Sequence, residues 1–197
     1  MEYKTFVIIG AMDGIKHDDI YNKLRVLDGI RVIFVEPIPY HFMSLTTNTN
    51  DLKGEIYYEC SAISNKRESV EMAYVHPADL CYYDDYIDGC SCVIEDGKPL
   101  NVFMKDVSPI HVTKHRVRSI TFDDLMDKYG WDSVDYIQVD CEGYDERIVG
   151  SIDLEKYGVK EIKFEKHYLS AIFYDYMKFR YKKYKTHIGE SDITFKI

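Results

Sequence analysis

The chain has 197 residues, of which 46% are hydrophobic and 30% charged, and this length and composition fit one globular domain without a disordered arm. Its formal net charge of −9 disfavours general nucleic-acid binding, because phosphate backbones repel an acidic surface. The apolar run at residues 6–9 is too short for a signal peptide or a membrane span, and five scattered cysteines favour a reducing compartment. We therefore expect a single-domain cytoplasmic protein.

The first third of the chain alternates strands with helices. Residues 3–9 are mostly β-branched and aromatic, carry no charge after Lys4 and end at Gly10, as a strand buried on both faces does. The elements predicted in chain order are strand 3–9, helix 18–27, strand 31–35, helix 40–45 and strand 56–63. This alternation predicts an α/β fold with a mostly parallel central sheet flanked by helices.

Residues 68–117 interrupt this pattern. They contain one predicted strand, at 70–75, and a predicted turn at 89–93. The acidic and aromatic residues at the centre of the segment are Tyr82, Tyr83, Asp84, Asp85 and Tyr86. An irregular segment of this length inside a compact domain is commonly functional, so we interpret it as an insertion that binds a substrate. A β-meander along the sheet edge is the alternative interpretation.

Regular order returns after the insertion. The predicted elements are strand 116–120, helix 122–129 with Thr121 as its N-cap, strand 134–139, helix 145–152 and strand 159–164. Residues 180–197 predict an antiparallel hairpin, which could close the sheet or form a homodimer. Cations alternate with aromatic residues at 177–185, which predicts a strand with a solvated cationic face; a contact for an anionic substrate is the alternative.

Two glycines follow the first predicted strand, in the sequence Gly10-Ala11-Met12-Asp13-Gly14. Glycines at such a turn let the backbone approach a ligand closely. The third glycine of the dinucleotide fingerprint and the Lys-Ser/Thr pair of a phosphate loop are both missing. The motif therefore favours a nucleoside without phosphates, or it is only a tight turn that requires positive φ.

Carboxylates follow two other predicted strands. Glu36 comes directly after the second strand, where an acid can accept hydrogen bonds from both hydroxyls of a ribose. Asp140, Glu142 and Asp145 follow the strand that ends at residue 139. Such a site, at the carboxyl end of a strand, attracts a cation and can deprotonate a hydroxyl group. Alternatively, Glu142 and Asp145 only complement the dipole of the following helix.

These motifs resemble those of the FkbM-type methyltransferases, in the same order along the chain. The matching segments are residues 10–14, 35–39, 61–64, 120–125 and 134–145, the last with the core Asp140-Cys141-Glu142-Gly143. The resemblance covers residues 6–167 in outline. Ile8 departs from it, because many methyltransferases have an acid two residues before the first glycine, and the insertion matches only weakly.

The resemblance implies a Rossmann-like class I methyltransferase fold over residues 1–197, an antiparallel C-terminal hairpin, and S-adenosyl-L-methionine as the cofactor. The residues that it assigns to the cofactor are Gly10, Ala11, Asp13, Gly14, Glu36, Pro37, Ser61, Ala62 and Asp140. In this assignment the glycine turn surrounds the methionine portion and Glu36 holds the ribose. The segment at Ser61 lies at the edge of the adenine, and Asp140 lies near the sulfonium.

The activity implied is transfer of a methyl group to a hydroxyl oxygen of a sugar or glycan, because the family includes enzymes that methylate glycans. The candidate catalytic residues are Asp140, Glu142, His167 and His17, and histidine has the pKa that suits proton removal near neutral pH. We expect no metal, although Asp140 and Glu142 could alternatively hold a divalent cation. An NAD-dependent oxidoreductase and a non-catalytic nucleoside-binding module are the competing functions.

Overall fold

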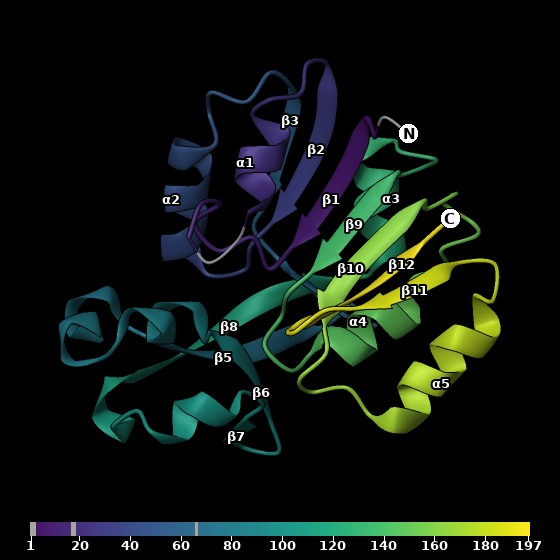
Figure 1. Ribbon diagram of the computed structural model, residues 1–197. Helices are drawn as coiled ribbons and strands as arrows, with labels where there is room; N and C mark the ends of the chain where they lie inside the picture. Colours follow the sequence, from purple (N-terminus) through teal and green to yellow (C-terminus); the bar gives the residue numbers. More distant parts are fainter. Residues whose placement is uncertain (1–2, 17–18, 66) are drawn as a thin grey trace.

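A computed structural model describes residues 3–16, 19–65 and 67–197, and it contains a seven-stranded and a five-stranded sheet (Figure 1). The strands of the larger sheet are β1 (Thr5–Ile9), β2 (Ile30–Val35), β3 (Gly54–Glu59), β9 (Tyr136–Val139), β10 (Glu161–Glu165), β11 (Lys185–Ile188) and β12 (Asp192–Lys196). Their spatial order is β11-β12-β10-β9-β1-β2-β3. The run from β3 to β10 is parallel, and β12 runs antiparallel to both of its neighbours, β10 and β11. This is a doubly wound α/β sheet with an antiparallel C-terminal hairpin.

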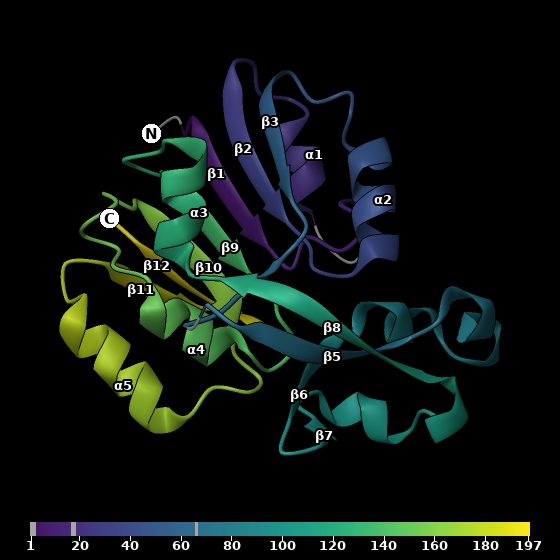
Figure 2. The same ribbon diagram turned by 180° about the vertical axis from the view of Figure 1, so that it is seen from behind.

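Helices cover both faces of this sheet. Alternate side chains of β1 point to opposite faces, and each set packs against a different group of helices. Phe6 and Ile8 pack with the helices α1 (Ile20–Leu24) and α2 (Pro39–Asn48). Val7 and Ile9 belong to the other core cluster, which includes residues of α3 (Phe122–Tyr129), α4 (Asp145–Ser151) and α5 (Ala171–Arg180). Figure 2 shows α3 and α4 on that second face. Burial on both faces explains the continuous apolar run of the central strands.

The second sheet lies beyond the carboxyl ends of β1 and β2 (Figures 1 and 2). Its strands, in spatial order, are β4 (Ala62–Ile63), β8 (Val112–Ile120), β5 (Ser69–Val75), β6 (Cys92–Glu95) and β7 (Lys98–Pro99). Between them lie the 3₁₀ helices η1 (Pro77–Tyr82), η2 (Asp85–Gly89), η3 (Val102–Lys105) and η4 (Pro109–His111). A small core of its own, including Ala73, Ile87 and Met104, stabilises this layer. The predicted insertion is therefore a structured layer placed at one end of the larger sheet.

Two sequence predictions in this region were wrong. Residues 56–63 do not form one strand, because β3 ends at Glu59 and β4 belongs to the second sheet. The corner between the two strands falls at Glu59, Cys60 and Ser61, and these polar residues marked a break that the prediction of a single strand overlooked. Residues 89–93 are not only a turn, because β6 starts at Cys92. The strand predicted at 70–75 is confirmed as β5.

One prediction for the C-terminal region, the strand at residues 177–185, was also wrong. Residues 177–185 are not a strand: most of them end α5 or form the following turn, and the hairpin starts only at Lys185. The buried residues Phe173, Met177 and Tyr181 recur every four positions, which is a helical spacing. The Ser170 hydroxyl caps α5 by accepting a hydrogen bond from the Phe173 amide at 3.1 Å. The alternation of cations and aromatic residues hid this period.

The remaining helices agree with the sequence apart from their lengths. The helix predicted at 18–27 is only the short α1, and residue 18 lies outside the described residues. The N-cap predicted at Thr121 is confirmed, since its Oγ1 accepts a hydrogen bond from the Asp124 amide at 3.1 Å, and the Asp124 side chain completes a capping box. None of the helices in the described part of the chain is long and apolar enough to cross a membrane.

Candidate functional site

Three of the predicted motifs meet at the carboxyl ends of adjacent strands. Gly10 follows β1, Glu36 follows β2 and Asp140 follows β9. The Gly10 amide donates to the Val35 carbonyl at 3.0 Å, and the Asp140 amide donates to the Ile9 carbonyl at 3.0 Å. The chain winds in opposite directions on the two sides of β1, so this is the switch point where doubly wound sheets bind their ligands.

Gly10 is required by close backbone packing as well as by its conformation. Its φ is +78°, and a Cβ atom at this position would lie 1.8 Å from the backbone oxygen of Asp140. Gly14, with φ +83°, is held against α2, because its Cβ would lie 2.6 Å from Thr49 Cγ2. The glycine turn is therefore fixed between β9 on one side and α2 on the other.

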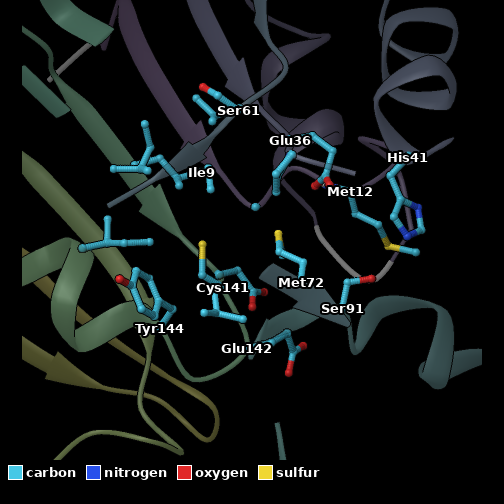
Figure 3. Close-up of a pocket in the computed structure, with 18 of the residues that line it drawn as sticks. Ile9, Met12, Glu36, His41, Ser61, Met72, Ser91, Cys141, Glu142 and Tyr144 are labelled. Atoms are coloured by element: carbon cyan, nitrogen blue, oxygen red, sulfur yellow. The ribbon is translucent and has the colours of Figure 1, made fainter. Parts of the chain in front are cut away.

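Two adjoining cavities occupy the space between the sheets. The smaller, of about 60 Å³, is lined by residues from both sheets and is shown in Figure 3. The larger is a cleft of about 760 Å³ beside it. The residues that line both are Gly10, Met12, Gly89, Asp140 and Glu142. The smaller pocket is narrower than most ligand sites, so a nucleoside at Glu36 must extend into the cleft or widen the pocket.

Most of the predicted site residues line one or both cavities. The smaller pocket is lined by Gly10, Glu36, Pro37, Ser61, Ala62, Asp140 and Glu142. The cleft adds Ala11, Gly14 and His167. Asp13 lines neither, because its buried carboxylate accepts hydrogen bonds from the amides of Ile15 and Lys16 and so stabilises the turn. His17 lies outside the described residues.

Glu36 is buried and held by two backbone amides. Its Oε2 accepts a hydrogen bond from the Met12 amide at 2.9 Å, and its Oε1 accepts one from the Ile38 amide at 2.7 Å. Burial raises the pKa of Glu36 to about 8, although the two amides act in the opposite direction. The carboxylate is thus fixed at the pocket wall, with lone pairs left for a ligand that donates hydrogen bonds.

Glu142 stands at the junction of the two cavities. Its backbone has φ +52°, a conformation that is unusual for a residue other than glycine and tends to occur at functional sites. The buried Asn101, from the second sheet, donates its Nδ2 to Glu142 Oε2. Burial, followed by the negative charge of Asp140, raises the pKa of Glu142 to about 9.

Two further carboxyl groups, of Asp145 and Glu165, act electrostatically on Glu142. Asp145 is fully buried and accepts hydrogen bonds from the amides of Cys141 and Gly143, and burial raises its pKa to about 7. Burial also raises the pKa of Glu165 to about 7, and its Oε1 lies 3.1 Å from His167 Nδ1. Such a site favours cationic and neutral ligands over anionic ones. In the described part of the chain, no group of three or more His, Cys, Asp or Glu residues is arranged to hold a metal ion.

The site contains residues that the sequence analysis missed. Glu165 follows a predicted strand, so the rule that found Asp140 could have found it as well. His41, Ser91 and Asn101 gave no such signal. Two of them come from the insertion, whose path in space the sequence does not define.

The thermal stability of the ligand-free protein is expected to fall as the pH rises from about 5 to about 9. Folding raises the carboxyl pKa to about 9 for Glu142 and to about 8 for Glu36. In this pH range the folded protein therefore binds more protons than the unfolded chain. Unfolding then releases protons, so stability decreases with rising pH. The melting temperature of Glu142→Gln should exceed that of wild type at pH 9 by a few degrees and match it near pH 5. Parallel pH profiles of the two proteins would contradict this assignment.

Comparisons with known proteins identify the family. The family model described as Methyltransferase FkbM domain matches residues 9–185. The crystal structure of Methyltransferase FkbM from Methylobacillus flagellatus KT is 13% identical, with a TM-score of 0.57, and the match covers 99% of this chain and 44% of that one. This chain therefore spans less than half the length of that protein. A search of the curated proteins finds no significant match.

Two other solved structures resemble the chain more distantly. The fibrillarin/Nop5p complex is 10% identical with a TM-score of 0.45, and the match covers 99% of this chain and 72% of that one. The delta-N METTL16 MTase domain is 12% identical with a TM-score of 0.42, and the match covers 100% of this chain and 73% of that one. With the family model matching most of its length, the chain belongs to the FkbM methyltransferase family and has the Rossmann-like class I methyltransferase fold.

Proposed function

We propose that this protein is an S-adenosyl-L-methionine-dependent O-methyltransferase that acts on a hydroxyl group of a sugar or glycan. The observation that carries the proposal is the convergence of Gly10, Glu36 and Asp140 at the switch point of the sheet, in a chain of the FkbM family. S-adenosyl-L-methionine, when bound, supplies an electrophilic methyl group on a cationic sulfur.

The residues present fit this cofactor. Glu36 would accept hydrogen bonds from the ribose hydroxyls, and the segment at Ser61 and Ala62 would lie beside the adenine. The turn at Gly10 lines both cavities and would lie beside the methionine portion. The exposed Asp140 would face the cationic sulfur, and a cation there would favour the ionised form of the neighbouring Glu142, whereas a pyrophosphate would oppose it. The acidity of the site therefore favours a sulfonium cofactor over a dinucleotide.

Glu142 is the residue best placed to accept the proton from the acceptor hydroxyl. It lines both the pocket assigned to the cofactor and the cleft beside it. Its raised pKa makes it a strong base once it is ionised, and that pKa falls towards neutrality when a cation lies at the neighbouring Asp140. Alignment of the acceptor oxygen with the methyl group would provide most of the rate enhancement, and the base would assist.

The cleft supports a polyhydroxylated acceptor. Tyr86 and Phe103, both about half exposed, pack edge to face at 5.7 Å and line it together with carboxylates. Aromatic faces and carboxylates are suitable partners for the apolar faces and hydroxyl groups of a sugar. Tyr83 has a different role, since its hydroxyl bonds with His111 Nδ1 at 2.8 Å and accepts from the Ser108 amide at 2.9 Å.

Calorimetric titration with S-adenosylhomocysteine tests the cofactor assignment. We expect the wild-type protein to bind, and Glu36→Ala to bind at least about a hundredfold more weakly, because the hydrogen bonds to both ribose hydroxyls are lost. Glu55→Ala, which removes an exposed acid near the start of β3, at the edge of the sheet opposite the site, serves as the control. Binding of NAD with no binding of S-adenosylhomocysteine would instead support an oxidoreductase.

Steady-state kinetics with a panel of sugar acceptors tests the acceptor assignment. Tyr86→Ala and Phe103→Ala are each expected to raise the acceptor KM by about tenfold, because one aromatic face of the cleft is lost. Tyr82→Ala is the matched control, since Tyr82 is also exposed in the insertion but stacks on His111 away from the cleft. Equal kinetics for all three variants would place the acceptor elsewhere.

A further inference from the structure

Two buried polar atoms in the smaller pocket have no hydrogen-bond partner. They are the Nδ1 atom of His41 and the Oγ atom of Ser91. His41 lies in the first turn of α2 and is only 3% exposed, whereas Ser91 precedes β6 in the second sheet. Both side chains line the same pocket as Glu36 (Figure 3). Buried polar groups are nearly always paired, so two unpaired ones facing one pocket require an explanation.

The surroundings of His41 determine which of its nitrogen atoms accepts. Its Nε2 atom lies 3.8 Å from Asp88 Oδ1, and Asp88 also binds Lys16 Nζ at 2.9 Å. Burial lowers the pKa of His41, although Asp88 and Asp13 act in the opposite direction. The ring is therefore neutral near pH 7, and the carboxylate favours the proton on Nε2. Nδ1 is left as an acceptor, so the missing partner is a hydrogen-bond donor.

The chemistry of the pocket narrows the choice of donor. Glu36 also presents acceptor oxygens, Asp140 and Glu142 line the pocket where it adjoins the cleft, and much of the remaining lining is apolar, with residues such as Val35, Ile63 and Met72. An ammonium or guanidinium group would be costly to bury among apolar side chains unless it met a full charge partner. Neutral hydroxyl groups satisfy acceptors of this kind without that penalty.

We propose that His41 and Ser91 bind the hydroxyl groups of the cofactor ribose together with Glu36, an inference that rests on the nucleoside site proposed above. The three side chains come from the end of β2, from α2 and from the second sheet. The second sheet therefore contributes to the cofactor site as well as to the acceptor cleft. Asp88 fixes this arrangement, because it connects η2 of the second sheet to Lys16 and faces the same histidine ring.

Calorimetric titration with three ligands tests the proposal: S-adenosylhomocysteine and its 2′-deoxy and 3′-deoxy analogues. His41→Phe keeps an aromatic ring but removes the acceptor, so we expect about tenfold weaker binding of S-adenosylhomocysteine. The same substitution should change binding of one deoxy analogue by less than about twofold, because that analogue lacks the partner hydroxyl. His41→Asn places an amide oxygen near the position of Nδ1 and should restore most of the affinity. Ser91→Ala should show the same selectivity towards the ribose hydroxyls.

The outcomes separate this proposal from the proposed function. Equal losses for all three ligands would mean that His41 only shapes the pocket, and unchanged affinities would mean that it makes no contact; either result overturns the inference and leaves the cofactor assignment intact. Failure of the wild-type protein to bind S-adenosylhomocysteine would overturn both. The ¹⁵N resonance of His41 Nδ1 in the wild-type protein provides a test without substitution. It should shift on addition of S-adenosylhomocysteine, and an unchanged resonance at saturation would contradict the contact.

Discussion

Replacing Glu142 by glutamine is expected to lower kcat roughly 10²–10⁴-fold, while the affinity for S-adenosylhomocysteine stays within about threefold of wild type. Glutamine keeps the size of the side chain and an oxygen that can accept the hydrogen bond from Asn101. It cannot accept the proton of the acceptor hydroxyl. The measurement is steady-state methyl transfer to a sugar acceptor, together with calorimetric binding of S-adenosylhomocysteine.

Glu146→Gln is the matched control for this experiment. Glu146 also lies in the acidic segment at the start of α4, but it bonds with Ser170 and lines neither cavity. Its substitution should leave kcat within about twofold of wild type. If Glu165→Gln or His167→Ala carries the large loss in place of Glu142→Gln, the base has been assigned to the wrong residue.

Gly10→Ala is expected to abolish cofactor binding and to lower the free energy of unfolding by more than about 3 kcal/mol, or to prevent folding. The new Cβ atom would lie 1.8 Å from the backbone oxygen of Asp140. No side-chain rotation relieves this contact, so β1 and β9 would have to separate at the proposed ligand site. Chemical denaturation and calorimetric titration measure the two effects.

Gly97→Ala separates the effect of packing from that of conformation. Gly97 has φ +76°, almost the same as Gly10, but nothing lies within 4 Å of the position of its Cβ. Its substitution should therefore cost only about 1–2 kcal/mol, the strain of a left-handed residue. Similar losses for the two variants would show that the approach of β1 to β9 is not what requires a glycine at position 10.

The central part of the fold could be predicted from the sequence because its signals are local. Buried parallel strands leave unbroken apolar runs, and the carboxyl end of each strand is where Gly10, Glu36 and Asp140 were expected to meet. Those residues do lie together, since the topology of the sheet determines their positions. Their roles in binding and catalysis stay predictions until the measurements described above are made.

The contribution of the second sheet to the site was not predictable, because it depends on contacts between segments that are distant in the sequence. Asn101 and Ser91 reach the site only through the path of the second sheet, and neither belongs to a motif. The sequence also did not show that the Asp13 carboxylate accepts hydrogen bonds from the amides of its own turn, and its predicted contact with the cofactor stays a prediction. The helical period of α5 was hidden because aromatic residues occupy both its buried and its exposed faces, as Phe173 and Phe179 show.

The way the chain enters and leaves the second sheet also has a consequence for protein engineering. At the entry β4 pairs in parallel with the end of β8, Ala62 beside Ser119 and Ile63 beside Ile120, so the two ends of the intervening segment lie next to each other. A segment with adjacent ends can be lengthened, shortened or exchanged without moving the strands that hold it. A chimaera joined at Ile63 and Ile120 should therefore fold around the unchanged Rossmann core, provided that the new segment keeps counterparts of Ser91 and Asn101 at the site.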